Sequence, residues 1–463
     1  MTQPALQPHW NMTPQDALAH WPSERPLAAL ITGAVHERWG RMSVLAQPSE
    51  THTIAWPGHG ADACRTALRE LERTLASHAW FEVDATSASA PSQASGLWIV
   101  SLAYEWGGLV EPSAMPRHRP PPDGWPLAVL AWCPHPLVYL HAERSWHAQP
   151  EAHELGELLH ARAHAARAMG AAPSTVITHL ESDEPRASFE RAVARTVEYI
   201  HAGDIFQANV AQRFSARWRG STRAIARAAF DAGEPRYGAY LETPTHALAS
   251  MSPELFLRVE RSGAAISRPI KGTLPSHERA DTLLASGKDA AELHMIVDLM
   301  RNDLGRLCVP GSVRVDQARA LESHATVHHA VAEISAHLRS GTSLLDVLRA
   351  TWPPGSVTGV PKVRALQVID ELEPVSRGPY CGAIGAVSLD ALTLNVGIRT
   401  ICMHRDAPGV DEGTLRYSAG CGIVAESVPG KEYEESLHKT AVMLHAAHAL
   451  RGRSAARGEA TRG

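Results

Sequence analysis

Hydrophobic and polar positions follow two different periods along the chain. Residues 27–140 combine short apolar runs, such as those at 97–100 and 127–130, with Pro, Gly and polar turns, a pattern typical of an antiparallel sheet. Apolar positions near a 3.6-residue period predict a helix over residues 186–202. The other strands predicted in this way are 238–241, 254–259, 383–389 and 394–401, and the other helices are 151–169, 288–304, 326–338, 363–372 and 431–448. Strands and helices mix without a regular βαβ rhythm, which favours an α+β fold.

The same pattern divides the chain into four stretches. We predict an N-terminal region over residues 1–150 and a helical bridge over residues 151–185. Residues 186–447 carry most of the predicted helices and form the predicted principal domain. Small and charged residues fill 448–463, and this composition predicts a disordered tail.

Charge and segment length exclude several classes of protein. The 463 residues carry a formal net charge of −5, without the basic excess that is typical of proteins bound to nucleic acid. No secretory signal is visible at the N-terminus, and the most apolar stretches, 96–104 and 126–133, are too short to span a bilayer. The six cysteines form no CxxC pair, which indicates reduced, buried thiols. We therefore expect a cytoplasmic protein that binds neither nucleic acid nor a membrane.

Two C-terminal features are candidates for chemistry. Glu432, Glu435 and Lys439 have the spacing that places side chains on one face of a helix. This spacing alone more often marks a solvated Glu–Lys pair. Gly420 and Gly422 follow a predicted strand, where backbone N–H groups can approach an anion or simply form a tight turn.

Two further features lie in the middle of the chain. Lys271 stands between an isoleucine and a glycine, so it is either a pocket nucleophile or an exposed turn residue. Glu292 is a candidate metal ligand. The nearby Asp298, Arg301 and Asp303 more simply form a structural ion-pair network.

These residues belong to a longer series of motifs. The series is GDIFQANVAQRF (203–214), SPELFLRVE (252–260), RPIKGT (268–273), AELHMIVDLMRNDLGR (291–306), TVHH (326–329), PPGSVTGVPKVRALQVIDELEP (353–374), YCGAIG (380–385), IRT (398–400) and AGCGIVAESVPGKEYEESLHK (419–439). With these motifs in this order, the chain resembles the chorismate-utilising enzymes, which include the anthranilate, aminodeoxychorismate, isochorismate and salicylate synthases. The likeness runs from about 189 to about 444. A weaker one covers SGLWIVSLAYEWG (95–107), which looks like the family's N-terminal domain.

The resemblance implies a fold, a metal and a set of site residues. The expected fold has large antiparallel sheets flanked by helices, and the principal domain is its chorismate-binding catalytic domain. Mg²⁺ is expected on Glu292 and Glu435, with Glu432 close by, as suits a metal that takes few carboxylates plus water and substrate oxygens. Glu254 matches the general acid that helps the C4 hydroxyl depart. The positions that match substrate-binding residues are His328, Tyr380, Arg399, Gly420, Gly422 and Lys439.

Lys271 discriminates between members of the family. Anthranilate, isochorismate and salicylate synthases resemble PIAGT at this point, whereas PIKGT looks like aminodeoxychorismate synthase component I. There the lysine attacks C2 of chorismate and ammonia then attacks C4, which divides one displacement into two easier steps. The sequence shows no glutamine amidotransferase region, so a separate glutaminase subunit, component II, is the expected source of ammonia.

Two alternatives remain open at this point. Anthranilate synthase component I would aminate C2 and would not need Lys271 as a nucleophile. A non-catalytic subunit with the same fold is disfavoured, because Glu254, Lys271, Glu292 and Glu435 are all retained.

Overall fold

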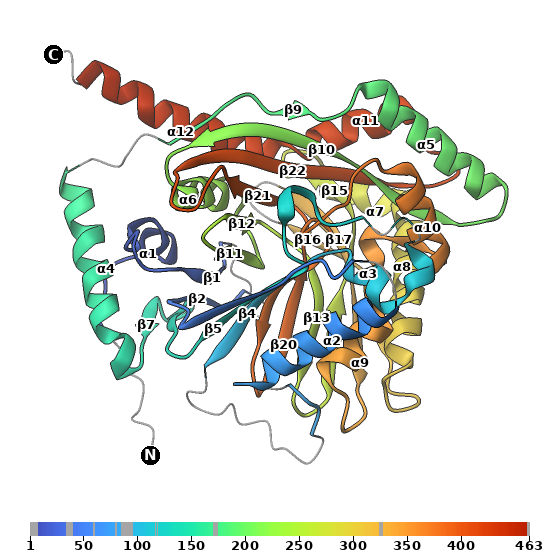
Figure 1. The fold of residues 1–463 in the computed structure, drawn as a ribbon. Coiled ribbons are helices and arrows are strands. Elements are labelled where there is room, and N and C mark those ends of the chain that lie inside the picture. Colours follow the sequence, from blue (N-terminus) through green and yellow to red (C-terminus); the bar gives the residue numbers. More distant parts are fainter. Residues whose placement is uncertain are drawn as a thin grey trace.

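Two antiparallel β-sheets that pack against each other organise the chain (Figure 1). The structure is a computed structural model. The residues that it describes are 8–33, 40–58, 61–78, 81–84, 96–115, 117, 119–169, 175–323 and 327–460. The expected α+β class with large antiparallel sheets is confirmed.

The first sheet is built around two long paired strands. Its order is β18 (Gly359–Val360), β10 (Gln207–Arg219), β22 (Glu412–Ile423), β21 (Thr400–Arg405), β12 (His246–Ser250), β11 (Gly238–Glu242), β1 (Ala28–Ile31), β2 (Met42–Ala46), β6 (Leu137–Leu140) and β7 (Ser145–His147). The short β8 (Val176–Ile177) and β9 (Glu181–Ser182) also pair with β10. Strands β10 and β22 pair over twelve positions, from Ala208–Ile423 to Arg219–Glu412.

The second sheet carries the strand that contains Lys271 at its edge. Its order is β15 (Ile270–Pro275), β17 (Val327–His337), β14 (Ala264–Arg268), β13 (Leu255–Glu260), β20 (Ala391–Val396), β19 (Ala383–Val387), β4 (Leu97–Leu102), β5 (Ala128–Cys133) and β3 (Glu50–Ile54). Strand β16 (Arg314–Ser323) also pairs with β17. Both sheets therefore take strands from each side of residue 150, and the predicted boundary there does not separate two sheets.

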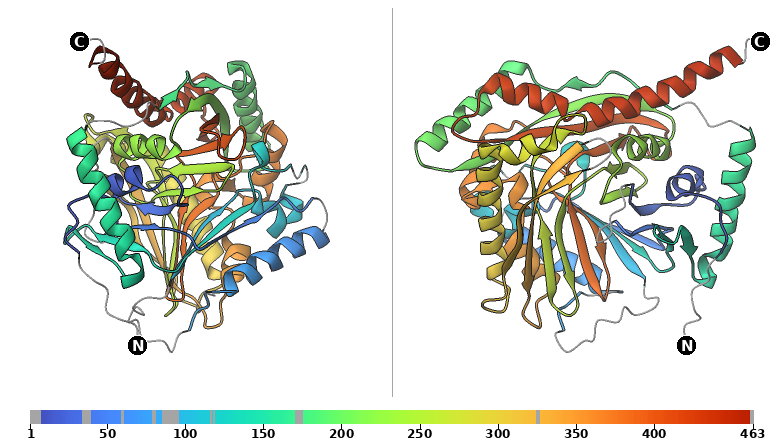
Figure 2. Two further views of the ribbon diagram at one scale, coloured as in Figure 1. Left: turned by 60° about the vertical axis from the view of Figure 1, so that its left-hand side comes forward. Right: turned by 180° about the vertical axis from the view of Figure 1, so that it is seen from behind.

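Helices cover the outer faces of both sheets (Figure 2). The second sheet is covered by α2 (Ala61–Ala76), α8 (Gly287–Gly305) and α9 (Leu344–Thr351). The first is covered by α1 (Pro14–His20), α4 (Pro150–Met169), α6 (Thr222–Gly233) and α12 (Ala441–Ala460). The remaining helices are α3 (Trp106–Val110), α5 (Arg186–His201), α7 (Ala280–Ala285), α10 (Lys362–Leu372) and α11 (Pro429–His438).

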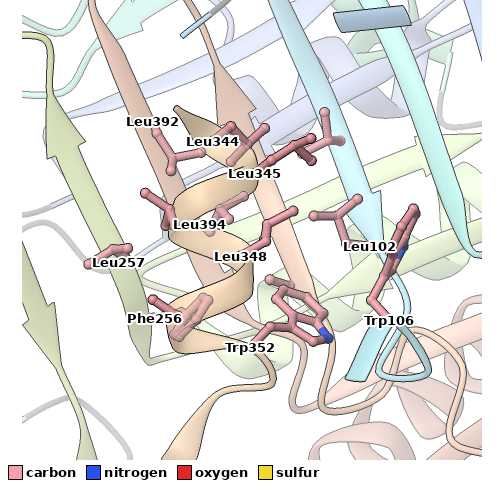
Figure 3. Close-up of a cluster of buried hydrophobic side chains, with 14 of the residues drawn as sticks. Leu102, Trp106, Phe256, Leu257, Leu344, Leu345, Leu348, Trp352, Leu392 and Leu394 are labelled. Carbon is pink, nitrogen blue, oxygen red and sulfur yellow. The ribbon is translucent and has the colours of Figure 1, made fainter. Parts of the chain in front are cut away.

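The largest apolar cluster fixes α9 on the second sheet. Figure 3 shows Leu344 and Leu348 of α9 beside Leu392 and Leu394 of β20. All four side chains are at most 1% exposed. Burying a leucine side chain contributes about 1.5–3 kcal/mol, so this contact anchors the helix that precedes the loop at 352–361.

Most predicted elements are present, and four differ. The predicted helix 326–338 is wrong, because Val327–His337 is strand β17; residue 326 lies outside the described residues. The predicted strand 394–401 breaks after Val396 and resumes as β21 in the other sheet. The predicted helix 431–448 is α11 and the start of α12, separated at residues 439–440. Helix α12 continues to Ala460, past position 448 where a disordered tail is predicted.

Two expectations about the whole chain concern cysteines and membranes. The six cysteines are free thiols, and five of them are buried. Over the described residues, no helix combines the length and apolar character that crossing a bilayer requires.

Candidate active site

Lys271 projects from a distorted point on the edge strand β15. The pairing of β15 with β17 slips by one residue between Ile270 and Thr273, and Gly272 has φ = +90° within that slip. A glycine suits this backbone because it lacks the Cβ that disfavours positive φ. The Lys271 side chain is only 12% exposed, and its Nζ lies 3.8 Å from Oε2 of Glu292. Lys271 is therefore a largely buried lysine and not an exposed turn residue. The surroundings of its amine are called the pocket.

Glu292 and Gly422 complete the surroundings of Lys271. Glu292 is buried on α8, and its Oε2 accepts a hydrogen bond of 3.2 Å from Nε2 of Gln207 on β10. A Cβ added to Gly422 would lie 2.5 Å from Gln207 Nε2, 2.9 Å from Glu292 Oε2 and 3.1 Å from Lys271 Nζ. Burial raises the pKa of Glu292, while Lys271 and Lys288 oppose that shift. The long pair β10–β22 thus places Gln207 and Gly422 against the edge of the other sheet.

Glu254 lies on the buried side of the same pocket. It precedes β13 and is 3% exposed. Burial raises its pKa to about 7, against the opposing influence of a hydrogen bond with Ser356 and the charge of Lys271. A carboxyl with such a pKa holds its proton at neutral pH much more often than an exposed glutamate, as a general acid requires.

Helix α11 carries a second carboxylate group beside the glycines. Lys439 follows α11, and its Nζ lies 2.8 Å from Glu435 Oε1 and donates to the Gly420 carbonyl at 2.7 Å. Buried Glu432 accepts hydrogen bonds on Oε1 from Ser427 Oγ at 2.7 Å and from Lys288 Nζ at 3.4 Å. These residues meet around the end of strand β22 at 420–422.

The carboxylates of α8 and α11 form one electrostatic cluster around Lys288. Burial opposes the charge of Lys288, but Glu432, Glu292 and Glu435 outweigh it and raise the Lys288 pKa. Partial burial likewise opposes ionisation of Glu435, but Lys439 reverses the effect and holds the pKa of Glu435 below its usual value. Three acids and two lysines, Lys288 and Lys439, therefore share a small region.

The donor set fits a hard divalent cation. Oε2 of Glu432 is buried and, within the described part of the chain, has no hydrogen-bond partner. Carboxylate oxygens from two helices suit Mg²⁺, which completes its shell with water and substrate oxygens. Glu292, Glu432 and Glu435 are the residues that would hold it.

Arg399 and Tyr380 lie on two loops that hydrogen-bond to each other. Arg399 has φ = +50° where the chain passes from β20 in one sheet to β21 in the other, and Cys381 beside Tyr380 has φ = +61°. The Cys381 N–H donates to the Gly397 carbonyl at 2.9 Å. Within the described residues Arg399 forms no ion pair, and burial lowers its pKa. A desolvated guanidinium without a carboxylate is suited to bind an anion.

The structure does not bring His328 to this pocket. Its Nδ1 hydrogen-bonds Ser323 Oγ on β16 at 2.8 Å. The neighbouring His329 is 2% exposed and contacts Thr273, two residues after Lys271, with 3.0 Å between Nδ1 and Oγ1. Successive side chains of a strand point to opposite faces, so only one of the two can face the pocket. His329 is therefore the histidine whose side chain contacts the strand that carries Lys271.

Comparison with known proteins shows which protein family this chain belongs to. A family model described as chorismate binding enzyme matches residues 42–445. The chain belongs to this family. The match includes the strands and helices that supply Lys271, Glu292, Gly422 and Glu435.

Curated members of the family carry two different names. Aminodeoxychorismate synthase component 1 from Salmonella typhimurium (strain LT2) is 39% identical over 287 residues, which cover 60% of this chain and 62% of the relative. Anthranilate synthase component 1 from Pseudomonas putida is 31% identical over 439 residues, covering 89% and 87%. The match thus spans about three fifths of the aminodeoxychorismate synthase relatives, and overall identity does not choose between the two names.

Two solved structures share the fold. Anthranilate synthase component I from Streptococcus pneumoniae TIGR4 superimposes with a TM-score of 0.69 at 24% identity, covering 87% of this chain and 92% of that one. The menaquinone-specific isochorismate synthase MenF from Escherichia coli gives 0.65 at 16% identity, covering 96% and 95%.

Four residues that lie around the candidate site are absent from the sequence-based prediction. Gln207, Ser356 and His329 all stand within the quoted motifs, so the motifs themselves were the available signal. Lys288 lies four residues before Glu292 on α8, a spacing that places two side chains on one helix face. Of the predicted ion-pair network, Arg301 pairs with Asp298 at 2.8 Å, whereas Asp303 pairs with Lys362 at 2.5 Å.

Proposed function

We propose that this chain is aminodeoxychorismate synthase component I, which converts chorismate and ammonia to 4-amino-4-deoxychorismate for p-aminobenzoate and folate synthesis. The observation that carries the proposal is the position of Lys271. Its amine is desolvated, lies beside Glu292, and is left accessible by the missing side chain at Gly422.

The chemistry follows from the groups around that amine. Lys271 attacks C2 of chorismate as the free amine, the double bond shifts, and the C4 hydroxyl leaves as water with the proton of Glu254. The secondary amine returns its proton to Glu254. Ammonia then attacks C4, the double bond shifts back, and Lys271 departs with that proton. The new ammonium group on C4 gives one proton to Glu254, which restores the acid. The balance is chorismate plus ammonia giving aminodeoxychorismate plus water, and the covalent step lowers each barrier.

The remaining residues bind and orient the substrate. In this proposal Arg399, Lys439 and the backbone N–H groups at 420–422 would bind its carboxylates, and Tyr380 would contact the substrate. Mg²⁺ held by Glu292, Glu432 and Glu435 would neutralise a carboxylate of the substrate. A separate glutamine amidotransferase subunit would supply ammonia, and both proteins would work in the cytoplasm.

Product analysis tests the proposal directly. The purified chain is incubated with chorismate, Mg²⁺ and ammonium, with and without aminodeoxychorismate lyase, and the products are separated and weighed by mass spectrometry. Aminodeoxychorismate that becomes p-aminobenzoate with the lyase is the expected result. Formation of anthranilate instead would identify the alternative, anthranilate synthase component I. Relatives with that name have a sequence identity to this chain similar to that of the aminodeoxychorismate synthases.

The role of Lys271 has its own test. We expect Lys271→Ala to abolish product formation, whereas Lys431→Ala, an exposed lysine of α11, retains it. Without ammonia, intact-protein mass spectrometry of the wild type should show an adduct of chorismate less water, and the adduct should be absent from Lys271→Ala. A wild-type rate in Lys271→Ala would contradict the covalent role of Lys271. The circular dichroism spectrum of each variant checks that the variant is folded.

A further inference from the structure

A thiol stands among the carboxylates of α11. Sγ of Cys421 lies with one carboxylate oxygen each of Glu432 and Glu435 in a group whose atoms are all within 4.8 Å of one another. Cys421 alternates on β22 with Gly420 and Gly422, so its side chain points away from Lys271 and toward α11. Its Sγ contacts the Glu432 carbonyl at 3.3 Å, which places it at the first turn of that helix.

The group holds a polar atom that is left unsatisfied. Glu432 is 4% exposed, and its buried Oε2 has no hydrogen-bond partner in the described part of the chain, although Oε1 has two. Leaving a buried acceptor unpaired costs about 1–3 kcal/mol, more when it is charged. A bound cation would remove that cost. The unpaired oxygen of Glu432, which also supports the Mg²⁺ site above, is therefore a sign of a cation at this end of the cluster that does not depend on the cysteine.

The ligand set determines which cation it prefers. Mg²⁺ takes hard oxygen ligands and gains nothing from sulfur. A thiolate with two carboxylates instead suits Zn²⁺ or Cd²⁺, because a soft sulfur ligand selects thiophilic metals. The lysines that now neutralise the carboxylates, Lys288 and Lys439, have side chains 45% and 44% exposed. Both can move into solvent when a dication enters.

We propose that Cys421, Glu432 and Glu435 form a binding site for thiophilic divalent cations, and that Zn²⁺ bound there blocks the magnesium-dependent reaction. When the metal binds, the Cys421 thiol releases its proton to the buffer and a sulfur–metal bond forms. With Zn²⁺ bound, Glu432 and Glu435 would no longer be available to Mg²⁺. The ion pair between Glu435 and Lys439 would also be lost. Only the block of catalysis rests on the proposed function. The binding itself does not.

Cadmium provides a readout that needs no turnover. The full chain is titrated with Cd²⁺, and the ultraviolet charge-transfer absorption of the cadmium–thiolate bond is followed, with Zn²⁺ as competitor. We expect one equivalent to develop the band in the wild type. Cys421→Ala should lack the band and bind Zn²⁺ at least roughly 10-fold more weakly, and Glu432→Gln should also weaken binding. Cys421→Ser repeats the test with a side chain of similar size if the alanine variant is unstable.

A second cysteine serves as the matched control. Cys402, on β21, is the more accessible thiol, so Cys402→Ala removes non-specific thiol binding and should retain the full band. A band that persists in both Cys421 variants, or that never forms in the wild type, would overturn the site. With turnover as a second readout, the Zn²⁺ concentration that halves each enzyme's own rate should rise at least roughly 10-fold in Cys421→Ala. If the chain makes anthranilate, the cadmium band still decides the binding site, so the two proposals fail separately.

Discussion

At the scale of single residues, Glu254 links burial to the pH dependence of the reaction. Because burial raises the pKa of this carboxyl to about 7, the acid form is lost as pH rises through that value. We predict that kcat falls as pH increases above about 7, and that Glu254→Gln lowers kcat by roughly 100-fold or more at every pH. The pH–rate profile of both enzymes is the measurement. A flat wild-type profile through pH 7 would remove Glu254 as the acid.

The same shift has a consequence for stability. The folded-state pKa lies above the ordinary value of 4.5, so the folded protein binds this proton more tightly than the unfolded chain. The stabilising contribution of Glu254 is therefore fully present below about pH 4.5 and is lost as pH rises through about 7. Its sign is opposite to that of an ion-paired carboxylate.

Two glycines of β22 lie close to different kinds of atoms. Gly422 faces the ends of side chains around Lys271, whereas Gly420 faces the backbone of β10. In Gly422→Ala the new Cβ meets the ends of the Gln207, Glu292 and Lys271 side chains, which can shift at little cost to folding. We predict that kcat/KM falls by roughly 100-fold, because the amine is displaced, while the melting temperature changes little.

The matched variant is Gly420→Ala on the same strand face. There the Cβ would lie 2.5 Å from the Val210 carbonyl oxygen and 2.8 Å from the Ala211 Cα, both backbone atoms of β10. It should lower the free energy of unfolding by about 1–3 kcal/mol, as overpacking does. Thermal melts and turnover of both variants decide; equal losses of stability would contradict the distinction.

Sequence predicts the chemistry of the site better than the orientation of its members. Lys271, Glu292 and Glu435 are identified by residue type and motif, and the structure brings them into one region. The sequence does not indicate that His329, and not His328, contacts Thr273 of β15. Adjacent side chains of a strand point in opposite directions, and a His-His pair gives no residue-type signal to choose between them. Register against β15 makes the choice, and register depends on residues far away in the sequence.

At the scale of elements, the errors occur where the surroundings override local preference. Strand β17 pairs with β14, β15 and β16 and is buried along most of its length, so it shows no two-residue alternation. Its alanines and histidines then resemble a helix. The strand predicted over 394–401 is interrupted by Arg399 at positive φ, and only the fold shows that β20 and β21 lie in different sheets.

A buried arginine joins the elements that support the pocket. Arg377 is bonded through Nη2 to Glu373 Oε1 at 2.6 Å, and it donates to the carbonyls of Val357 at 2.9 Å and Asn209 at 2.6 Å. It also stacks over the Tyr104 ring at 4.5 Å. One side chain thus ties the end of α10 to β10, to the loop after α9 and to the segment that leads into Tyr380.

Removing that arginine should therefore be costly. We predict that Arg377→Met lowers the free energy of unfolding by about 3–5 kcal/mol, because Glu373 is left buried without its partner. The control is Arg186→Met, whose pairs with Glu190 and Glu434 lie at the surface, where solvent screens them and their loss changes stability little. Urea denaturation of both variants measures the difference, and a similar small loss in each would refute the structural role of Arg377.

At the scale of the whole molecule, the two sheets make the chain one cooperative unit. Strands β1, β2, β6 and β7 continue the sheet that β10 and β22 begin, and β3, β4 and β5 continue the sheet that contains β15. Neither side of residue 150 completes a sheet alone. The apolar cluster between the sheets also draws on both, for example Ile99 with Leu248.

The distribution of tryptophans allows the cooperativity of unfolding to be measured. Ten of the twelve tryptophans precede residue 150, and only Trp218 and Trp352 follow it, so fluorescence reports chiefly on the N-terminal part. Far-ultraviolet circular dichroism is dominated by helices such as α5, α8 and α12, which follow residue 150. We predict that both signals change in a single coincident transition during urea unfolding, because strands shared between the two parts cannot separate without breaking both sheets. A fluorescence transition at clearly lower urea would instead show that the N-terminal strands detach first, and the pocket would then rest on the C-terminal elements alone.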